Sequence, residues 1–428
     1  MFDLGGLAAV DPHADEAALV ARIDELERVK SAAAAGQARA SAALDEKRRA
    51  DEAAAGVPAH QRGRGVASEV GLARRDSPAR GSRHLSVAKT LVHDMPHTLA
   101  ALESGALSEW RAGLIVRETA GLSVEDRAVL DAELCADAST LDGLGDNRIS
   151  AAAKQIAHRL DAQAVRDRAV NAEADRRVTI RPAPDAMTYV TALLPAAQGA
   201  GVYAALNRAA DTTVDHRSRG AVMADTLVER VTGRPAGTPE PVAVNLVLSD
   251  ETLLGGDNTP AVIEGYGPIP ASVARSLVDA AVTDERSRAT LRRLYRHPAT
   301  GALVAMESQS RRFPKGLAKF IRLRDLSCRT PYCDAPIRHL DHAQPRNRAG
   351  PTNAANGLGM CERCNYVKEV PGWHVCAGDD ENGVHTAEFT TPTGMRHHST
   401  APPPPGPPPI MVSEIETRIG IALAQHAA

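Results

Sequence analysis

The chain is poor in aromatic residues, since Phe, Trp and Tyr make up only 3% of its 428 positions. Its apolar content of 43% therefore comes largely from Ala, Leu and Val, which favours packed helices. With so few rings, recognition of single-stranded nucleic acid by base stacking is not favoured. The formal net charge of −3 means that bulk charge does not indicate a polyanionic partner either.

The sequence also lacks long hydrophobic runs. No stretch of 18 apolar residues exists, so we expect no membrane crossing. Residues 1–10 carry no Lys or Arg ahead of an apolar segment, so they do not resemble an export signal. We therefore expect a cytoplasmic protein whose thiols stay reduced.

Cysteine is rare, yet four of the six cysteines form two close pairs, Cys328-x4-Cys333 and Cys361-x2-Cys364, with 27 residues between the pairs. Two short knuckles separated by a longer loop are typical of a structural Zn²⁺ site with four thiolate ligands. Two disulfides are the alternative, which a reducing compartment disfavours. The other two cysteines have no partner at ligand spacing and are predicted to be small buried apolar side chains: Cys135 and Cys376.

The loop between the cysteine pairs carries a second pattern. Residues 337–342 read as a short strand that ends in Asp341-His342, and residues 357–360 can return as a second strand. Residues 361–370 have the composition of a short helix, which Pro371-Gly372 would end. The sequence therefore predicts a ββα unit held by zinc.

The polar residues of this unit suit hydrolysis of a phosphodiester. Asp341 at a strand end and Asn365 on the helix can supply oxygens to a hard divalent cation such as Mg²⁺. His342 would point to the other side of the strand, away from the cation, where it can take a proton from water. A base near pH 7 and a cation that holds charge on the phosphate are what this reaction needs.

These residues resemble the motif of the HNH endonucleases. The resemblance implies that Asp341 is a metal ligand, that His342 is the general base and that Asn356 ties the loop by hydrogen bonds to backbone. It assigns the last metal-ligand position to Asn365 and a place near the phosphate to Lys368. Many members have His where this chain has Asn365, and a neutral amide binds metal more weakly than imidazole does.

Basic residues gather in and just before this segment. Residues 311–348 contain ten Lys or Arg and three Asp, a local charge of +7. We expect contacts to the phosphate backbone of DNA, with Arg346 and Arg348 among the phosphate-binding residues; a solvated helix face is the alternative. The ten basic residues are Arg311, Arg312, Lys315, Lys319, Arg322, Arg324, Arg329, Arg338, Arg346 and Arg348.

The rest of the chain reads as helices with a few hairpins. Residues 14–54 predict a long helix whose apolar residues Leu19 to Val29 would pack against later helices, because the heptad pattern is not sustained past Val29; a coiled-coil arm is the alternative. Further helices are predicted at 108–119, from Ser123, and at 148–172, 196–210 and 221–232. Strands are predicted at 178–180 with 187–191, at 242–248, at 291–295 with 303–307, and at 373–375 with 384–389.

Most of residues 15–310 resembles domain of unknown function 222, of the 13E12-repeat type, which commonly precedes HNH motifs. The resemblance implies an accessory role in DNA or partner binding, and no chemistry. It is carried by residues 91–98, 100–105, 181–195, 224–229 and 265–269.

Together these patterns predict a mainly α protein with small β hairpins and a C-terminal zinc-stapled ββα-metal nuclease domain. The predicted domains are 1–65, an N-terminal helix and linker; 66–310, a helical domain; 311–398, the nuclease; and 399–428, a Pro-rich tail with a short helix. The predicted function is hydrolysis of DNA phosphodiester bonds with one divalent cation. The alternative is a catalytically inactive, zinc-containing nucleic-acid-binding protein.

Overall fold

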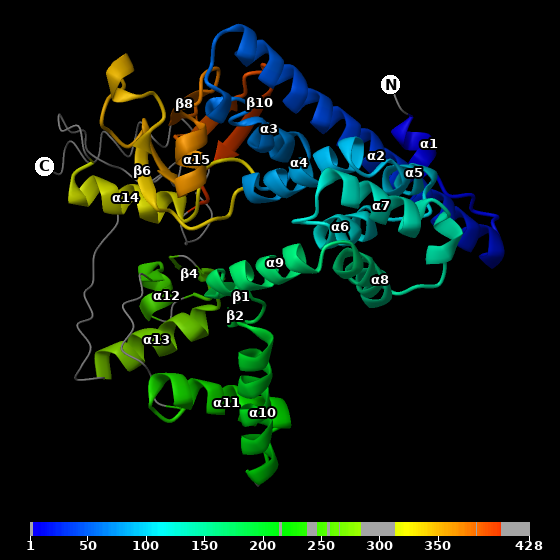
Figure 1. Ribbon diagram of the computed structural model, residues 1–428. Coiled ribbons are helices and arrows are strands. Elements are labelled where there is room, and N and C mark those ends of the chain that lie inside the picture. Colours follow the sequence, from blue (N-terminus) through cyan, green and yellow to red (C-terminus); the bar gives the residue numbers. More distant parts are fainter. Residues whose placement is uncertain are drawn as a thin grey trace, which may run out of the picture. The chain divides into compact units, whose positions relative to one another are not determined.

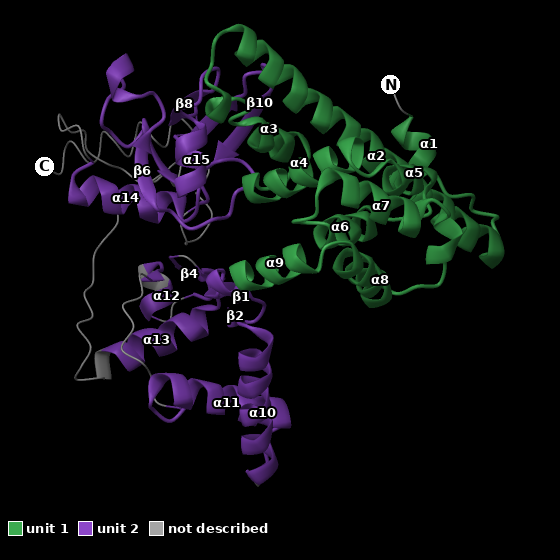
Figure 2. Ribbon diagram, in the orientation of Figure 1, with its two compact units in different colours: residues 1–172 green, residues 173–428 purple. Residues whose placement is uncertain are grey.

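The computed structural model describes residues 3–213, 216–237, 246–254, 257–264, 266–283, 313–381 and 383–403. Across these residues the chain is mainly helical with small antiparallel sheets, which confirms that part of the predicted fold class (Figure 1). The chain divides into two compact units, residues 1–172 and 173–428 (Figure 2).

The first unit is built from helices, several of which begin at a serine. The side chains of Ser108 and Ser123 accept hydrogen bonds from backbone N–H groups three residues later, at 3.3 and 3.0 Å, so both predicted helix starts are confirmed. The helices are α1 (Leu4–Ala8), α2 (Glu16–Ala54), α3 (Val66–Ala73), α4 (Pro78–His93), α5 (Pro96–Ser104), α6 (Glu109–Glu118), α7 (Val124–Cys135), α8 (Asp146–Leu160) and α9 (Ala162–Ala174), with 3-10 turns at Ala59–Gln61 and Ala138–Leu141.

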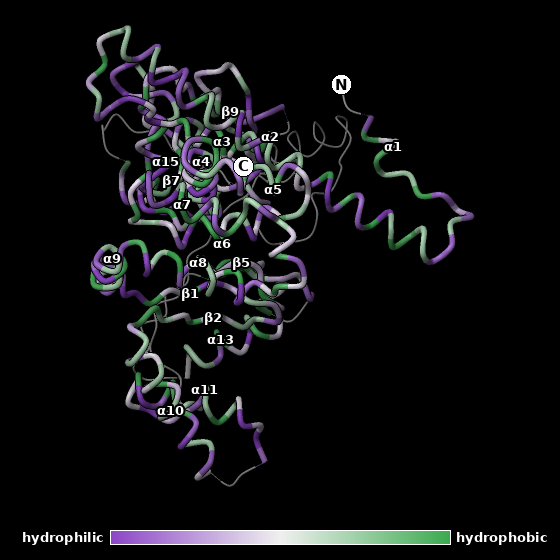
Figure 3. The backbone as a smooth tube through the Cα atoms, turned by 45° about the vertical axis from the view of Figure 1, so that its right-hand side comes forward, coloured by the Kyte–Doolittle hydropathy of each residue, from purple (hydrophilic) through white to green (hydrophobic). Residues whose placement is uncertain are grey.

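Helix α2 has the predicted length but packs through other residues than predicted. Val20 and Ile23 are 66% and 68% exposed, because the first turns of α2 run outward from the core of this unit with α1 beside them (Figure 3). The buried contact is made later in the helix by small side chains, which let neighbouring helices approach closely. These side chains include Ala34, Ala35, Ala38 and Ala42.

The core of the first unit is aliphatic, as the scarcity of aromatics requires. Large side chains such as Leu91, Met95 and Ile115 are almost fully buried, and Cys135 lies among them as predicted.

The prediction of a single helix over residues 148–172 was wrong. Asp161 ends α8 and accepts a hydrogen bond from Ala164 N at 2.8 Å, so its carboxylate begins α9 as a new helix.

The second unit begins with the hairpin that the sequence predicts. β1 (Arg177–Ala183) pairs antiparallel with β2 (Met187–Leu193), and the turn residues Asp185 and Ala186 both have positive φ, 59° and 60°. This is the backbone twist that favours a tight hairpin. The elements that follow are α10 (Ala196–Thr212), α11 (Arg219–Thr232), β3 (Leu246–Val247), α12 (Asp250–Leu254), β4 (Ala261–Ile263), β5 (Gly267–Ile269) and α13 (Ala271–Thr283), with β3, β4 and β5 in one antiparallel sheet.

Residues 313–403 form the C-terminal part of this unit. The predicted hairpin after residue 373 is confirmed, and a third strand, β10, was missed because its polar side chains give no apolar alternation. On the edge strand β8 the side chain of Cys376 is exposed, so its predicted burial was wrong. The elements are α14 (Lys315–Asp325), β6 (His339–His342), a 3-10 turn at Arg346–Arg348, β7 (Gly357–Met360), α15 (Glu362–Val367), β8 (His374–Asp379), β9 (His385–Thr390) and β10 (Arg396–Thr400).

A buried carboxylate joins these elements. Asp325, at the end of α14 and 1% exposed, accepts hydrogen bonds from Arg324 at 2.7 and 3.1 Å, from Arg329 at 3.1 Å and from Gly359 N at 2.7 Å. Arg329 also donates to the carbonyl oxygen of Ser399 in β10 at 2.8 Å. Helix α14, strand β7 and strand β10 are therefore fastened to one charged cluster.

Several predictions lie outside the described residues: the hairpin at 291–295 and 303–307, most of the strand at 242–248, and nearly all of the tail from residue 399. The three boundaries between the four predicted domains stay predictions. In the part of the chain that is described, none of the helices combines the length and apolar composition that a bilayer crossing requires.

Candidate metal centre and catalytic site

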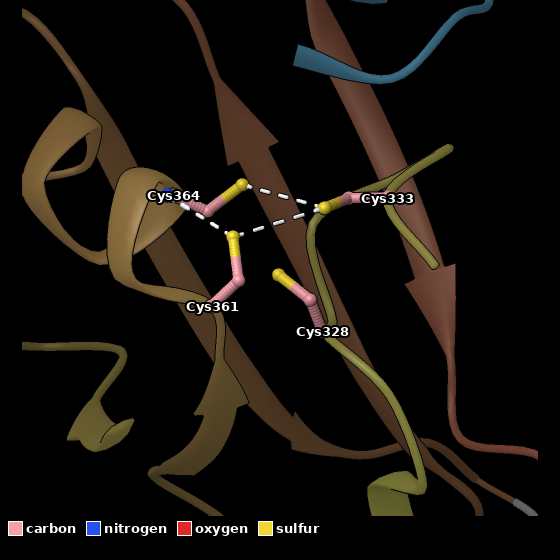
Figure 4. A group of neighbouring side chains, drawn as sticks. All are labelled: Cys328, Cys333, Cys361 and Cys364. Atoms are coloured by element: carbon pink, nitrogen blue, oxygen red, sulfur yellow. Dashed lines mark hydrogen bonds between the residues drawn. The ribbon is translucent and has the colours of Figure 1, made fainter. Parts of the chain in front are cut away.

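The four paired cysteines come together, as Figure 4 shows. Their sulfur atoms all lie within 4.8 Å of one another, and all four residues are buried. Two cysteines precede β6, and the other two lie at the first turn of α15, where Cys361 caps the helix and accepts a hydrogen bond from Cys364 N at 3.4 Å. The loop between the pairs is thus closed at its base by four thiols.

The spacing of the sulfurs fits a tetrahedral ion. Zn–S bonds of about 2.3 Å place neighbouring sulfurs about 3.8 Å apart. The sulfur of Cys333 lies 3.9 Å from that of Cys361 and 3.7 Å from that of Cys364, and the cysteines are free thiols, which overturns the disulfide alternative. Hydrogen bonds from the other three thiols lower the pKa of Cys361. The cluster could hold a metal ion such as zinc.

The segment between the knuckles folds as strand, strand and helix. β6 and β7 pair antiparallel, with Asp341 opposite Leu358 and His342 opposite Gly357, and α15 follows directly. The glycines of β7 keep this hairpin close to its neighbours. A Cβ at Gly357 would come within 2.5 Å of Ile321 in α14, and one at Gly359 within 2.5 Å of Ile337.

Asp341 lies at the strand end with two partners of its own. One carboxylate oxygen accepts the backbone N–H of His342 at 2.9 Å, and the other is 2.9 Å from the ammonium of Lys368. The sequence assigns Lys368 to phosphate binding, but its side chain is only 3% exposed and is also paired with Glu369. Lys368 therefore neutralises Asp341 in this structure and does not face solvent.

His342 is held firmly from two sides. Its Nε2 is 2.8 Å from the hydroxyl of Thr352, which is itself 1% exposed, and its ring lies 4.6 Å from that of Phe313. Burial lowers the pKa of His342 below its ordinary value and outweighs the nearby Asp341 carboxylate. A neutral imidazole in a fixed orientation is the state that a general base requires.

The two asparagines differ in their surroundings. Asn356 is buried, accepts from Gln344 N at 2.8 Å, and donates to the carbonyl oxygens of Gln344 at 3.0 Å and Pro351 at 2.8 Å, the loop-tying arrangement that the sequence suggests. Asn365 instead has a buried side-chain oxygen without a hydrogen-bond partner among the described residues. A buried bare oxygen is costly unless a donor or a cation meets it, so Asn365 fits a ligand position.

A pocket of about 860 Å³ opens beside Asp341 and His342, and neither Asn356 nor Asn365 is among the residues that line it. Both Asp341 and His342 line it, with Arg322 and Arg346 as cations on its wall. Arg348 is exposed nearby on the same 3-10 turn. Arg324 and Arg329 do not belong to the predicted basic patch, since both are buried against Asp325. Arg311 and Arg312 lie outside the described residues.

Sequence reasoning missed three residues that hold this site together: Asp325, Thr352 and His385. Asp325 was counted only as a charge among arginines. The Nε2 of His385 donates to Ala355 O at 2.9 Å, and its Nδ1 lies 3.2 Å from Arg329. In the sequence, Asp325 lies between Arg324 and Arg329, immediately before the first cysteine pair. This order of charges fits a set of ion pairs better than a solvent-exposed helix face.

Most of the chain matches the model of a known protein family. The model of the family described as Domain of unknown function (DUF222) matches residues 24–325. The chain belongs to this family. The match ends at Asp325, so all four knuckle cysteines and Asp341-His342 lie beyond the stretch that defines DUF222 membership.

Relatives occur in Mycobacterium tuberculosis. The uncharacterized protein Rv3776 of strain H37Rv is 28% identical over 417 residues, covering 84% of this chain and 75% of that protein. The uncharacterized proteins Rv2100 of H37Rv and MT2160 of strain CDC 1551 are each 32% identical over 142 residues, covering 32% of this chain and 24% of each of those proteins. No solved structure matches the chain significantly.

Proposed function

We propose that the C-terminal part of this DUF222 protein is a metal-dependent endonuclease of the HNH type that hydrolyses phosphodiester bonds of DNA. One observation carries the proposal: a buried, oriented imidazole and a carboxylate share one pocket, on the chain segment that lies between the two cysteine pairs of a four-thiol cluster. In this proposal the thiols of Cys328, Cys333, Cys361 and Cys364 hold a structural zinc ion.

The residues of the pocket divide the chemistry between them. His342 takes a proton from the water that attacks the phosphorus, while Thr352 keeps the ring turned toward the reacting atoms. Asp341 and the bare oxygen of Asn365 would hold a divalent cation such as Mg²⁺. When bound there, that cation would stabilise charge on the scissile phosphate.

The arginines of the pocket suit a phosphate backbone. Arg322 and Arg346 line the cavity, and Arg348 is exposed beside it. Arginine offers a planar fork that matches phosphate oxygens, and such contacts position a duplex without reading its sequence. Base choice would then depend on other parts of the protein.

A second candidate is supported by Lys368. Its ammonium lies 2.9 Å from Asp341, where it supplies the positive charge that a metal ion would otherwise bring. If this pair is permanent, the module binds zinc and nucleic acid without catalysis. The neutral Asn365 at the last ligand position favours the same alternative.

Plasmid nicking with added Mg²⁺ or Mn²⁺ tests the proposal. We expect the wild-type chain to nick supercoiled DNA and His342→Ala to lose that activity while its zinc content and DNA binding stay unchanged. His339→Ala is the matched control, because His339 lies on the same strand and makes no contact with Thr352. Equal nicking by wild type and His342→Ala would contradict the assignment of the base.

Lys368→Ala separates the two candidates. If the ammonium competes with the cation for Asp341, this variant should nick at lower Mg²⁺ concentrations than wild type. Wild-type and variant proteins that both bind DNA and one zinc ion yet never nick would support the inactive alternative.

A further inference from the structure

Helices α3 and α4 of the first unit pack directly against each other (Figure 1). In the turn that joins them, Arg75 has a φ of 56° and the N–H of Asp76 donates to Gly71 O at 2.8 Å, which ends α3. Ser77 then begins α4 by accepting a hydrogen bond from Arg80 N at 3.4 Å. A turn that spans only residues 74–77 between two packed helices is typical of a helix-turn-helix.

Two glycines set the distance between these helices. A Cβ at Gly81 of α4 would lie 2.1 Å from Ala67 O and 2.8 Å from the Cα of Gly71, both in α3. A side chain at Gly81 would therefore collide with the backbone of α3, and the two helices touch where they meet. Since Val66 and Leu72 anchor α3 in the interior, α3 fixes the orientation of α4.

The outer face of α4 is polar and basic. Arg80, Arg83 and Ser86 are exposed, and their spacing of three residues places them along one side of the helix. Ala88 and Leu91, on other sides of α4, are buried. The helix is thus held by its buried sides and presents a row of hydrogen-bonding side chains to solvent.

This region has no large excess of charge, but some of its cations are unpaired. Residues 62–93 contain seven Lys or Arg. The carboxylates that belong to this segment or contact it all have other partners: Asp45, Glu46, Glu52, Glu69, Asp76 and Glu109. Three exposed arginines have guanidinium groups without an ion pair or hydrogen bond among the described residues: Arg64, Arg75 and Arg83.

The three unpaired arginines lie where a helix-turn-helix meets DNA. Arg83 is on the outer face of α4, Arg75 is in the turn before α4, and Arg64 is in the loop before α3. In such motifs the second helix enters the major groove and contacts base edges near its start, while the first helix crosses the backbone. The planar fork of arginine matches O6 and N7 of guanine in that groove.

We propose that α3 and α4 are a helix-turn-helix that binds the major groove of duplex DNA. Arg83 and Ser86 contact base edges, and Arg64 and Arg75 bind phosphates. Duplex RNA does not fit, because its major groove is too narrow for side chains to read. The inference does not depend on the proposed nuclease activity, since an inactive C-terminal module would leave α4 unchanged. It supplies the base recognition that phosphate contacts at the C-terminal pocket lack.

Selection from a library of duplex DNA with a randomised centre tests this proposal, with the full chain and no added Mg²⁺, so that no cleavage intervenes. We expect one base pattern to be enriched. Fluorescence anisotropy then compares the enriched duplex with a scrambled duplex of the same composition. Arg83→Ala should reduce the preference for the enriched duplex about tenfold or more. Arg64→Ala and Arg75→Ala should weaken binding of both duplexes alike and lower the salt slope by about one each.

Two further variants sharpen the assignment. Arg83→Lys keeps the charge but removes the planar fork, so it should lose most of the preference while keeping its affinity for the scrambled duplex. Arg148→Ala is the matched control, because Arg148 is an exposed arginine of α8 without an ion pair among the described residues. It should change neither the preference nor the salt slope. Circular dichroism melts establish that each variant is folded; if Arg83→Ala is not, Arg83→Lys decides.

Three results would overturn the proposal: no enriched base pattern, an unchanged preference in the folded Arg83 variants, or tighter binding of the same sequence as duplex RNA. The nuclease proposal fails separately, through the plasmid assay. A chain that never nicks DNA and yet prefers the enriched duplex through Arg83 would refute the nuclease and support the helix-turn-helix.

Discussion

Loss of the Asp325 carboxylate should unfold the C-terminal module at low denaturant. Asp325→Ala would leave Arg324 and Arg329, which are 7% and 3% exposed, without their counter-ion. Removing one partner of a buried ion pair costs about 3–5 kcal/mol. The N–H of Gly359 would also lose its acceptor, at about 1–3 kcal/mol. We expect a loss of about 4 kcal/mol or more, a large part of a typical domain's stability.

Urea unfolding followed by tryptophan fluorescence measures this loss. Trp373 is 5% exposed and reports on the C-terminal module, whereas Trp110 belongs to the first unit, so a Trp110→Phe background isolates the signal. Asp325→Asn keeps an acceptor for Gly359 and should cost less than Asp325→Ala. Asp334→Ala is the control, because Asp334 is exposed in the same segment. A loss below about 0.5 kcal/mol in Asp325→Ala would refute the reasoning, since surface substitutions usually change stability by up to that amount.

Two further predictions concern the metal cluster and a buried histidine. Purified protein should carry one zinc ion per chain. Because structural zinc contributes directly to folding, Cys361→Ser should lower the zinc content measured by mass spectrometry and should expose Trp373 to solvent. A full zinc content in that variant would argue against the four-cysteine site. Burial lowers the pKa of His385 to about 4. Below pH 6.5 the unfolded chain therefore binds a proton that the folded chain excludes down to pH 4, so stability falls as the pH falls through this window. From pH 7 to pH 4.5 this amounts to about 2–3 kcal/mol, and urea midpoints for His385→Gln should lack that part of the pH dependence.

Local patterns in the sequence predicted the elements well where side-chain chemistry decides the backbone. The serine caps at Ser108 and Ser123, the hairpin around Asp185 and the antiparallel strands of the ββα segment each depend on residues close together in the chain. The sequence also predicted that the two cysteine pairs come together, because the spacing of metal ligands follows directly from the short loop within each pair. These signals do not require knowledge of the rest of the fold.

Tertiary packing explains what the sequence did not reveal. The apolar residues at the start of α2 looked like a core stripe, yet the alanines later in the helix make the buried contact. The partner of Lys368 could not be read from spacing, because Asp341 lies on a strand 27 residues earlier in the chain. The sequence placed Arg324 and Arg329 in the basic patch predicted to contact phosphates, but in the structure both side chains are buried and paired with Asp325.

The cluster around Asp325 also bears on where the C-terminal module begins. The DUF222 match ends at this residue, while its carboxylate is bonded to Gly359 in β7 and, through Arg329, to Ser399 in β10. Helix α14 therefore completes the C-terminal module although it lies inside the family match. A fragment that begins at residue 326 would leave Arg329 buried without its carboxylate and should be unstable. A fragment that begins at Phe313 keeps α14, and it also keeps the ring that packs on His342. Comparing the thermal melts of these two fragments would reveal whether the limit of sequence similarity is also a limit of folding.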